Sequence, residues 1–221
     1  DWVPTRENRE YEAALGTMEG MIDELVADRR GTQGHGEDAP SDLLSILLRA
    51  QERGEQSDQQ IRDEVMTILL AGHDTTALTL TYAWYLLSQH PEAEARLRAE
   101  VDGVLSDGRA PTMAQVRELD YTERVLQESM RLYPPVYVMF REPKVDVRIG
   151  DYRVPEGAAV MLPQWVVHRS DRYWENPTEF DPDRFTPERS RDRPRFAYFP
   201  FGGGPRHCIG KHLSLLEGRI I

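Results

Sequence analysis

The sequence predicts a mainly α-helical protein with one minor β-hairpin. Two observations support this fold class. Apolar residues recur at helical spacing over most of the chain up to Tyr133, and one later stretch, VDVRIGDYRVPEGAAVML, alternates in the way that paired strands do. With 221 residues, 39 % of them hydrophobic, the chain can bury a sizeable core as one domain or as part of a larger one.

The first helix is predicted from apolar residues one turn apart, and it extends to about Arg30. These residues are Tyr11, Leu15, Met18, Ile22 and Leu25. The glycines and proline of GTQGHGEDAP then predict a loop, and a short helix is expected from Asp42.

A long central helix is predicted to follow. Ser57 with Gln60 three residues later is typical of a capping box, and no helix breaker occurs before His90. Pro91 stands where the next helix would begin. About 30 residues of helix are about 45 Å long, which is enough to cross a whole domain.

The rest of the chain is predicted to hold shorter elements. Two helices are expected near 92–104 and 113–119, and another from about Thr122 to Tyr133, where Pro134 and Pro135 stop it. The hairpin turns at Gly150-Asp151, residues 163–207 form an extended meander, and helical spacing resumes after Cys208. The sequence starts and stops abruptly, so we expect it to be a piece of a longer chain.

Composition excludes several classes of protein. The longest apolar stretches are interrupted by Asp, Arg or Gly, so neither a membrane span nor a signal peptide is predicted. A single cysteine excludes an internal disulfide framework and a four-ligand zinc site, and it favours a reducing cytoplasm. The net charge of −11 argues against nucleic acid as the main partner.

That single cysteine, Cys208, lies in the glycine-rich stretch FPFGGGPRHCIG at a predicted loop-to-helix junction. The amide groups of a first helical turn favour a thiolate there. Glycines let the loop approach a large flat partner, and Arg206 adds a cation that could pair with a carboxylate. Together these features suit the proximal face of a haem, with sulfur on iron and arginine on a propionate.

Two other interpretations of Cys208 remain open. A buried, inert cysteine is the more common fate of a lone cysteine, but it does not explain the loop. A cysteine nucleophile needs a histidine base, and although His207 is adjacent, neighbouring side chains in an extended loop diverge.

The pattern F-x-x-G-x-R-x-C-x-G resembles the haem-binding signature of the cytochrome P-450 monooxygenases. Here it comprises Phe201, Gly204, Arg206, Cys208 and Gly210. The resemblance implies that haem is the cofactor, that Cys208 is the metal ligand, and that the other four residues contribute to cofactor binding. It also implies that Phe201 packs against the thiolate and tunes the potential of the iron.

The stretch AGHDTT, within the long helix, resembles the oxygen-binding motif of the same family. Gly72 in the middle of a helix costs about 1 kcal/mol relative to alanine, and hydroxyl groups bonded to the preceding turn could loosen the helix into a groove. The resemblance implies that Thr75 holds dioxygen and a water, that Asp74 supplies protons, and that Ala71 and Gly72 border the cofactor.

Two further motifs are similar to family motifs, and they occur in the family order. ESMR places Glu128 and Arg131 three residues apart, where they can pair as many solvated surface residues do. FDPDRF supplies Arg184, with Asp183 in place of the usual glutamate. The resemblance implies that Glu128, Arg131 and Arg184 form a buried structural triad.

The stretch VYVMFR is too apolar for an exposed loop. By resemblance, Val138 and Met139 would line the substrate pocket and Arg141 would bind a propionate, whereas ordinary core is the alternative for the two apolar residues. HRSDRYW, from His168, is similar to a structural turn of the family, and no chemistry is predicted for it.

The four motifs cover residues 71–210 and indicate the C-terminal, haem-proximal half of a P-450 fold, with a long central helix, haem-proximal helices and a cysteine-ligand loop. The implied reaction is insertion of one atom of O2 into an apolar organic substrate, with electrons from a ferredoxin/reductase-type donor. A peroxide-using haem-thiolate enzyme and a non-catalytic haem sensor or carrier are the alternatives. The isolated fragment is expected to be inactive, and it could fold without haem.

Overall fold

The computed structural model describes residues 5–32, 42–106 and 108–221. Its fold is mainly helical with short antiparallel strand pairs, which confirms the predicted class. The chain divides into two compact units, residues 1–73 and 74–221, and the long helix α3 (Asp58–Gln89) contributes to both. Across the described ranges, no helix combines the length and the apolar composition that crossing a bilayer requires.

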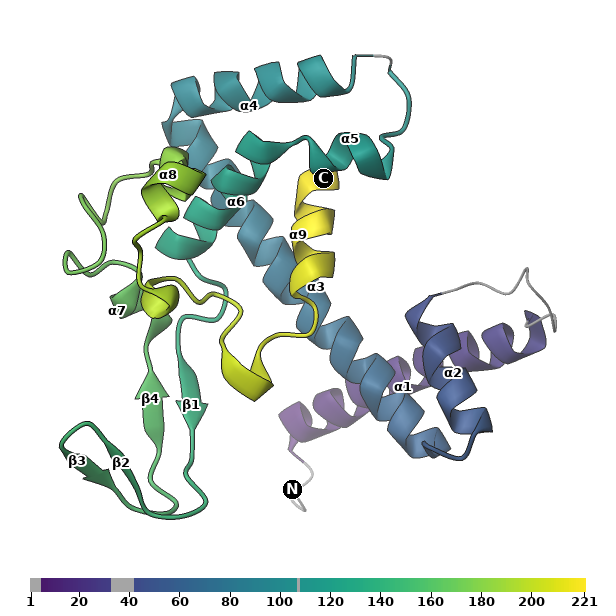
Figure 1. Cartoon of the computed structure of the whole chain (residues 1–221). Helices are drawn as coiled ribbons and strands as arrows, with labels where there is room; N and C mark the ends of the chain where they lie inside the picture. Colours follow the sequence, from purple (N-terminus) through teal and green to yellow (C-terminus); the bar gives the residue numbers. More distant parts are fainter. Residues whose placement is uncertain (1–4, 33–41, 107) are drawn as a thin grey trace. The chain divides into compact units, whose positions relative to one another are not determined.

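The regular elements of the first unit are all helices in its described residues (Figure 1). It consists of α1 (Arg6–Thr32), α2 (Leu43–Glu52) and the beginning of α3. Residues 33–40 of the predicted loop lie outside the described residues, whereas Gly31 and Thr32 still belong to α1. The buried core joins all three helices through Ile22, Val26, Leu48 and Ile61.

The starts of α2 and α3 are capped by side chains. The N–H of Ser45 donates to the Asp42 carboxylate at 3.0 Å, which fixes the start of α2. Ser57 and Gln60 form the predicted capping box, because each backbone N–H donates to the other residue's side-chain oxygen, at 2.8 and 3.2 Å. The prediction of where α3 begins is therefore confirmed.

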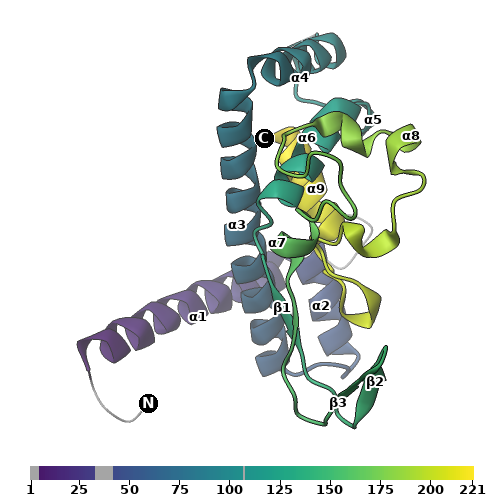
Figure 2. The same ribbon diagram turned by 90° about the vertical axis from the view of Figure 1, so that its left-hand side faces the viewer.

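The helices of the second unit pack around α6 (Figures 1 and 2). They are the end of α3, α4 (Pro91–Val104), α5 (Met113–Arg117), α6 (Asp120–Leu132) and α9 (Lys211–Ile220). Helix α9 lies against α6, and a Cβ at Gly218 would lie only 2.9 Å from Cδ1 of Leu126. Any larger residue at position 218 would have to displace the Leu126 side chain.

Helix α6 has no side-chain cap of its own at Leu119, and α4 provides the missing acceptors. Both carboxylate oxygens of Glu100 accept hydrogen bonds from the N–H groups of Tyr121 and Thr122, at 2.6 and 2.8 Å. A carboxylate at a helix N-terminus also interacts favourably with the helix dipole. Glu100 thus joins α4 to the start of the central helix of this unit.

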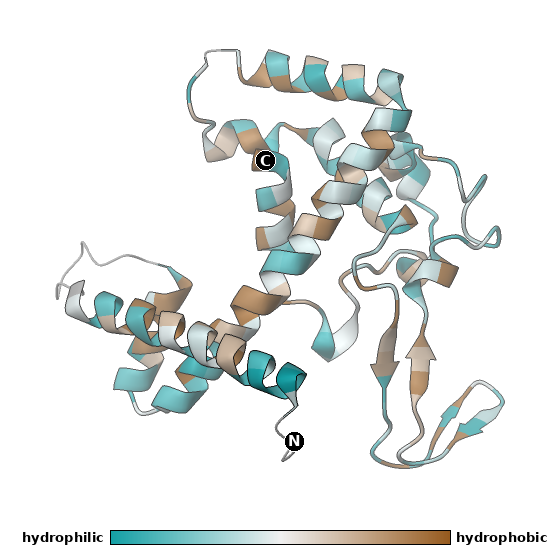
Figure 3. Ribbon diagram, turned by 180° about the vertical axis from the view of Figure 1, so that it is seen from behind, coloured by the Kyte–Doolittle hydropathy of each residue, from teal (hydrophilic) through white to brown (hydrophobic). Residues whose placement is uncertain are grey.

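Two separate strand pairs replace the single predicted hairpin. β2 (Val147–Ile149) and β3 (Tyr152–Val154) pair around the predicted Gly150-Asp151 turn. β4 (Val160–Leu162), however, pairs with β1 (Met139–Arg141), with Phe140 opposite Met161. Figure 3 shows largely hydrophobic colour on β1 and β4. The last three residues of the VYVMFR stretch therefore form a paired strand, which the sequence did not predict.

The predicted meander after β4 is mostly irregular but contains short helical turns. These are α7 (Gln164–Val167), the 3-10 turn η1 (Pro182–Phe185), α8 (Pro187–Ser190), and the 3-10 turns η2 (Arg195–Ala197) and η3 (Gly204–Arg206). The last turn leads directly into the cysteine loop, which we define as residues 199–210.

Candidate functional site

Cys208 lies on the surface, between the turn η3 and the start of α9. Its backbone N–H donates to the carbonyl oxygen of Phe201 at 2.8 Å, which closes the loop on itself. Gly202 and Gly204 have φ values of +73° and +70°, a region that side chains other than glycine rarely adopt. The loop therefore presents the sulfur on a sharply folded backbone.

The three consecutive glycines have different roles. A Cβ at Gly203 would lie 2.5 Å from the ring of Phe196, and one at Gly202 would lie 3.3 Å from the sulfur of Met139. At Gly204 the same atom would have no neighbour within 4 Å among the described residues. The prediction that all three leave room for a partner is therefore refined, because a side chain at Gly202 or Gly203 would press on Met139 or Phe196.

The other residues of the cysteine motif lie in the same loop. Arg206 is exposed, whereas Phe201 and Gly210 are half-buried. A ring nitrogen of His207 lies 3.1 Å from the carbonyl oxygen of Gly204. His207 thus contacts the backbone of its own loop, which does not favour its use as a base for a cysteine nucleophile.

Helix α9 brings the cysteine loop to α3 within the second unit. The hydroxyl groups of Ser214 in α9 and Thr76 in α3 are 3.4 Å apart, and the N–H of Ser214 donates to Gly210 at 2.9 Å. Thr75, the neighbour of Thr76, is half-buried, and Asp74 is exposed. The segment predicted to handle protons is therefore joined to the helix that follows Cys208.

Ala71 and Gly72, the first two residues of the AGHDTT motif, belong to the first unit and are exposed. Helix α3 continues from Asp58 to Gln89, so the AGHDTT stretch does not end the helix. The hydroxyls of Thr79 and Thr81 donate to carbonyls one turn earlier, at 2.9 and 2.8 Å, without ending the helix.

The structure places Glu128, Arg131 and Arg184 together in the interior. Glu128 and Arg131 are 0 % exposed and Arg184 is 4 % exposed. The Glu128 carboxylate accepts two hydrogen bonds from Arg131, at 2.6 and 2.7 Å, and one from Arg184, at 3.3 Å. These side chains form a buried ionic cluster and not a solvated surface pair.

Backbone groups satisfy the rest of this cluster. Arg131 also donates to the carbonyls of His168, Pro177 and Glu179, and Arg184 donates to those of Glu175 and Asn176. Burial raises the pKa of the Glu128 carboxyl, and hydrogen bonds and charge from Arg131 oppose that shift. The two arginines therefore tie the meander to α6 through a fully paired network.

Asp183, the departure from the family motif, has a separate structural role. Its carboxylate accepts from Arg96 in α4 at 2.8 Å and from Arg124 in α6 at 2.7 Å. The hydrogen bond from Arg96 lowers the pKa of Asp183. The shorter acid thus holds η1 against two helices, while the adjacent Arg184 reaches the buried cluster.

The residues predicted to line the substrate pocket lie on or beside β1. Val138 and Met139 are half-buried, and Met139 contacts the cysteine loop at Gly202. Arg141 is exposed, and its guanidinium donates to the carbonyl of Phe140 at 2.8 Å. The structure therefore places Met139 beside the glycines before Cys208, whereas the Arg141 guanidinium binds a carbonyl of its own strand.

Two residues that sequence reasoning did not select are Gln164 and His168. Both are completely buried, and both bind the backbone of Phe199 at the start of the cysteine loop. The available signal was a polar pair four residues apart in the otherwise apolar stretch QWVVH. Such a pair lies on one side of a helical turn.

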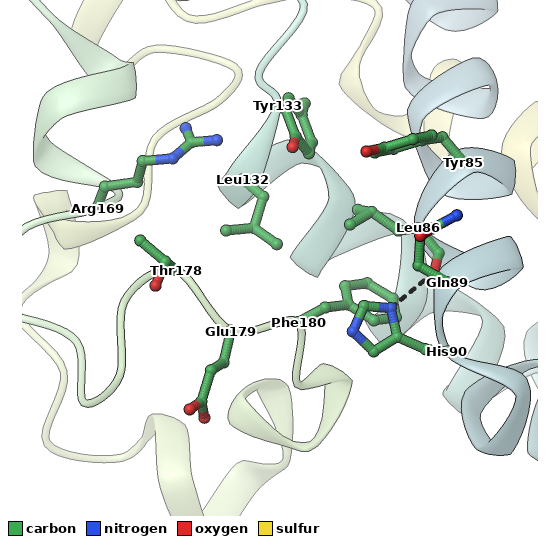
Figure 4. Close-up of a pocket in the computed structure, with 10 residues that line it drawn as sticks. All are labelled: Tyr85, Leu86, Gln89, His90, Leu132, Tyr133, Arg169, Thr178, Glu179 and Phe180. Atoms are coloured by element: carbon green, nitrogen blue, oxygen red, sulfur yellow. Dashed lines mark hydrogen bonds between the residues drawn. The ribbon is translucent and has the colours of Figure 1, made fainter.

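Two cavities lie in the second unit. One, of about 610 Å³, is lined by residues 199–204 of the cysteine loop together with α6 and the start of α9. Another, of about 650 Å³, lies between the end of α3, the end of α6 and the meander (Figure 4). Figure 4 shows Tyr85, Tyr133 and Arg169 around it, and Phe180 of the FDPDRF stretch also lines it.

Comparisons with known proteins agree with these motifs. The family model for cytochrome P450 matches residues 1–221. The chain is 42 % identical to cyclooctatin synthase of Streptomyces melanosporofaciens, and the match covers 99 % of this chain and 47 % of that protein. It is 37 % identical to pentalenene oxygenase of Streptomyces avermitilis, over 99 % of this chain and 48 % of that protein.

Solved structures agree as well. The crystal structure of the cytochrome P450DA heme domain matches with a TM-score of 0.87 and 39 % identity, over 96 % of this chain and 47 % of that chain. The chain therefore belongs to the cytochrome P450 family, and it spans about half the length of the relatives it matches. Haem is the cofactor of that family.

The cysteine loop fits such a group. The Cys208 sulfur is exposed, and a thiolate is a soft donor that suits iron. Ile209, next to the cysteine, is 92 % exposed. An exposed apolar side chain beside an exposed thiol is consistent with a surface that a large, flat, apolar cofactor covers.

Proposed function

We propose that the protein containing this chain is a haem-thiolate monooxygenase. It inserts one atom of O2 into an apolar organic substrate and reduces the other to water, using two protons and two electrons from a ferredoxin/reductase-type partner. The observation that carries this proposal is the single exposed cysteine, Cys208, on a closed glycine loop in a chain of the cytochrome P450 family.

Haem, when bound, supplies the site at which dioxygen is activated and electrons are received. The Cys208 sulfur is the proposed iron ligand, with Phe201 packed near it and Gly204 and Gly210 shaping the loop. Arg206 and Arg141 are exposed cations suited to the two propionates. Arg141 must release the carbonyl of Phe140 to take this role.

Asp74 and Thr75 are the proposed proton-handling pair. The Thr75 hydroxyl holds a water near the reacting oxygen, and the Asp74 carboxylate supplies protons to it. The contact between Thr76 and Ser214 supports this role, because it joins the next residue of α3 to the helix that follows Cys208. A proton relay is needed for reducing dioxygen to water, but not for carrying haem or for using peroxide.

An apolar substrate is supported by the names of two relatives, pentalenene oxygenase and cyclooctat-9-en-7-ol 5-monooxygenase. Both names describe oxygenation of a molecule that is largely hydrocarbon. Val138 and Met139 are the proposed lining of that pocket. The cytoplasmic location and the inactivity of the isolated chain stay predictions.

A coupling measurement in the intact protein tests the monooxygenase against the carrier and the peroxide user. In Thr75→Ala, haem binding and oxygen consumption should persist, while product formed per reducing equivalent falls by at least about tenfold and hydrogen peroxide is released. Thr75→Ser keeps the hydroxyl and should restore most of the coupling. Equal coupling in alanine and threonine enzymes would contradict the proposed proton relay.

A further inference from the structure

The start of the cysteine loop is held by two side chains from a single helical turn. The Nε2 of Gln164, the first residue of α7, donates to the carbonyl oxygen of Phe199 at 2.6 Å. The N–H of Phe199 donates to Nε2 of His168 at 3.0 Å. Both backbone groups of one residue are thus bound by side chains spaced four residues apart.

These two side chains lie in the protein interior. Gln164 and His168 are each 0 % exposed. The imidazole ring also packs against the rings of Tyr198 and Phe199, with centroid separations of 5.3 Å in both cases. Loss of His168 would leave the N–H of Phe199 without its acceptor, and loss of Gln164 would remove one of the donors to the Phe199 carbonyl.

Hydrogen bonds continue from Phe199 to the cysteine. The carbonyl of Phe199 also accepts from the N–H of Gly202 at 2.9 Å, which closes a tight turn. The carbonyl of Phe201, inside that turn, accepts from the N–H of Cys208 at 2.8 Å. The position of Phe199 therefore determines where the backbone of Cys208 can lie.

The same histidine is joined to the buried ionic cluster. The carbonyl oxygen of His168 accepts from Nη1 of Arg131 at 2.8 Å. His168 thus binds Arg131 through its main chain and Phe199 through its ring. It is the link between the cluster in the interior and the loop on the surface.

We propose that Gln164 and His168 are positioning residues that form a two-point clamp on the Phe199 backbone and thereby hold the Cys208 sulfur in place as a metal ligand. The clamp needs a neutral imidazole, because Nε2 must accept a hydrogen bond. Burial lowers the pKa of His168 to about 4, and the charge of Arg131 acts in the same direction, so the neutral form prevails at neutral pH.

This proposal rests on the proposed role of Cys208 as iron ligand, and the experiment separates the two. It compares wild-type intact holoprotein with His168→Leu, which removes the acceptor, and with His168→Gln, which keeps an acceptor at similar reach. Gln164→Met removes the other hydrogen bond of the clamp and keeps a side chain of similar length. It provides a second test if His168→Leu yields no holoprotein. Val125→Ala, in the buried cluster with Leu87 and Ala93, is the control for general destabilisation.

Two measurements are made on each variant. Hydrogen exchange of residues 198–202 should become about tenfold faster or more in His168→Leu and Gln164→Met, because the Phe199 amide and its turn open locally. The fraction of the reduced carbon monoxide complex with thiolate ligation should fall in the same variants and recover in His168→Gln. Val125→Ala should lower the urea midpoint without either change.

Wild-type exchange and wild-type thiolate ligation in His168→Leu and Gln164→Met would overturn the clamp. Equal changes in Val125→Ala would overturn it too, because they would reflect general loss of stability. If the wild-type protein itself shows no thiolate ligation, the proposed function is contradicted. The hydrogen-exchange measurement would still test the clamp in that case, because it reports on the protein backbone.

Discussion

The buried cluster of Glu128, Arg131 and Arg184 and the exposed cysteine loop differ in almost every physical respect. The cluster has no exposed charge, and its carboxylate and guanidinium groups are paired with side chains and carbonyls. The loop contains exposed residues and glycines with positive φ. The comparison indicates that the cluster provides stability, and that the loop is left open for chemistry.

The largest expected effect is in the cluster. Glu128→Ala leaves two buried guanidinium groups without their carboxylate partner. It should destabilise the intact protein by about 3–5 kcal/mol, so that little folded holoprotein remains. Glu94→Ala, which breaks the exposed pair with Arg98 at 2.7 Å, is the matched control and should cost less than about 0.5 kcal/mol. Urea unfolding and haem content measure both. If Glu128→Ala and Glu94→Ala lose equally little stability, burial of the cluster contributes nothing to the stability of the protein.

The second effect depends on pH and concerns His168, between the two regions. Its pKa is about 4 in the folded protein and about 6.5 when unfolded, and the nearby cations Arg131 and Arg169 both favour the neutral ring. The unfolded state therefore binds more protons between these values. The stability contribution is complete above pH 6.5 and is lost as pH falls towards 4, by up to about 3 kcal/mol.

Urea midpoints of wild-type protein and His168→Gln at pH 7 and pH 5 measure this dependence. The wild type should lose more stability than the variant on acidification, because glutamine does not titrate. If both proteins lose the same stability between pH 7 and pH 5, titration of His168 does not cause the pH dependence.

The smallest expected effect is in the loop. Gly204 has a positive φ, so Gly204→Ala should cost about 1 kcal/mol from backbone strain alone. Gly103→Ala is the control of opposite sign, because Gly103 lies in helix α4 and should gain about 0.5–1 kcal/mol. If both substitutions stabilise the protein, the loop does not hold Gly204 in the left-handed conformation.

Local patterns were sufficient to predict most of the helices. The start of α3 was predicted from the Ser57 and Gln60 capping box, and the hairpin from the turn at Gly150-Asp151. These features depend on residues that are close in sequence. The structure places the motif residues in two groups, the cysteine loop and the Glu128 cluster.

Contacts between distant segments could not be predicted in the same way. The pairing of Phe140 with Met161 has no local turn signal, so the residues of β4 were assigned to the neighbouring hairpin. The contact of Gln164 and His168 with Phe199 joins residues more than 30 positions apart. The packing of Gly203 against Phe196 depends on the folded loop, so the glycines were explained by an external partner alone.

The most direct test of the account is the carbon monoxide difference spectrum of the reduced intact protein, wild type against Cys208→Ser. Because Cys208 is exposed and its side chain changes little in size, urea unfolding of the haem-free protein should shift by less than about 0.5 kcal/mol. The wild type should give the thiolate-type spectrum and the serine variant should lose it completely. An unchanged spectrum in Cys208→Ser would contradict the assignment of Cys208 as the iron ligand, and with it the division between a stabilising cluster and a reactive loop.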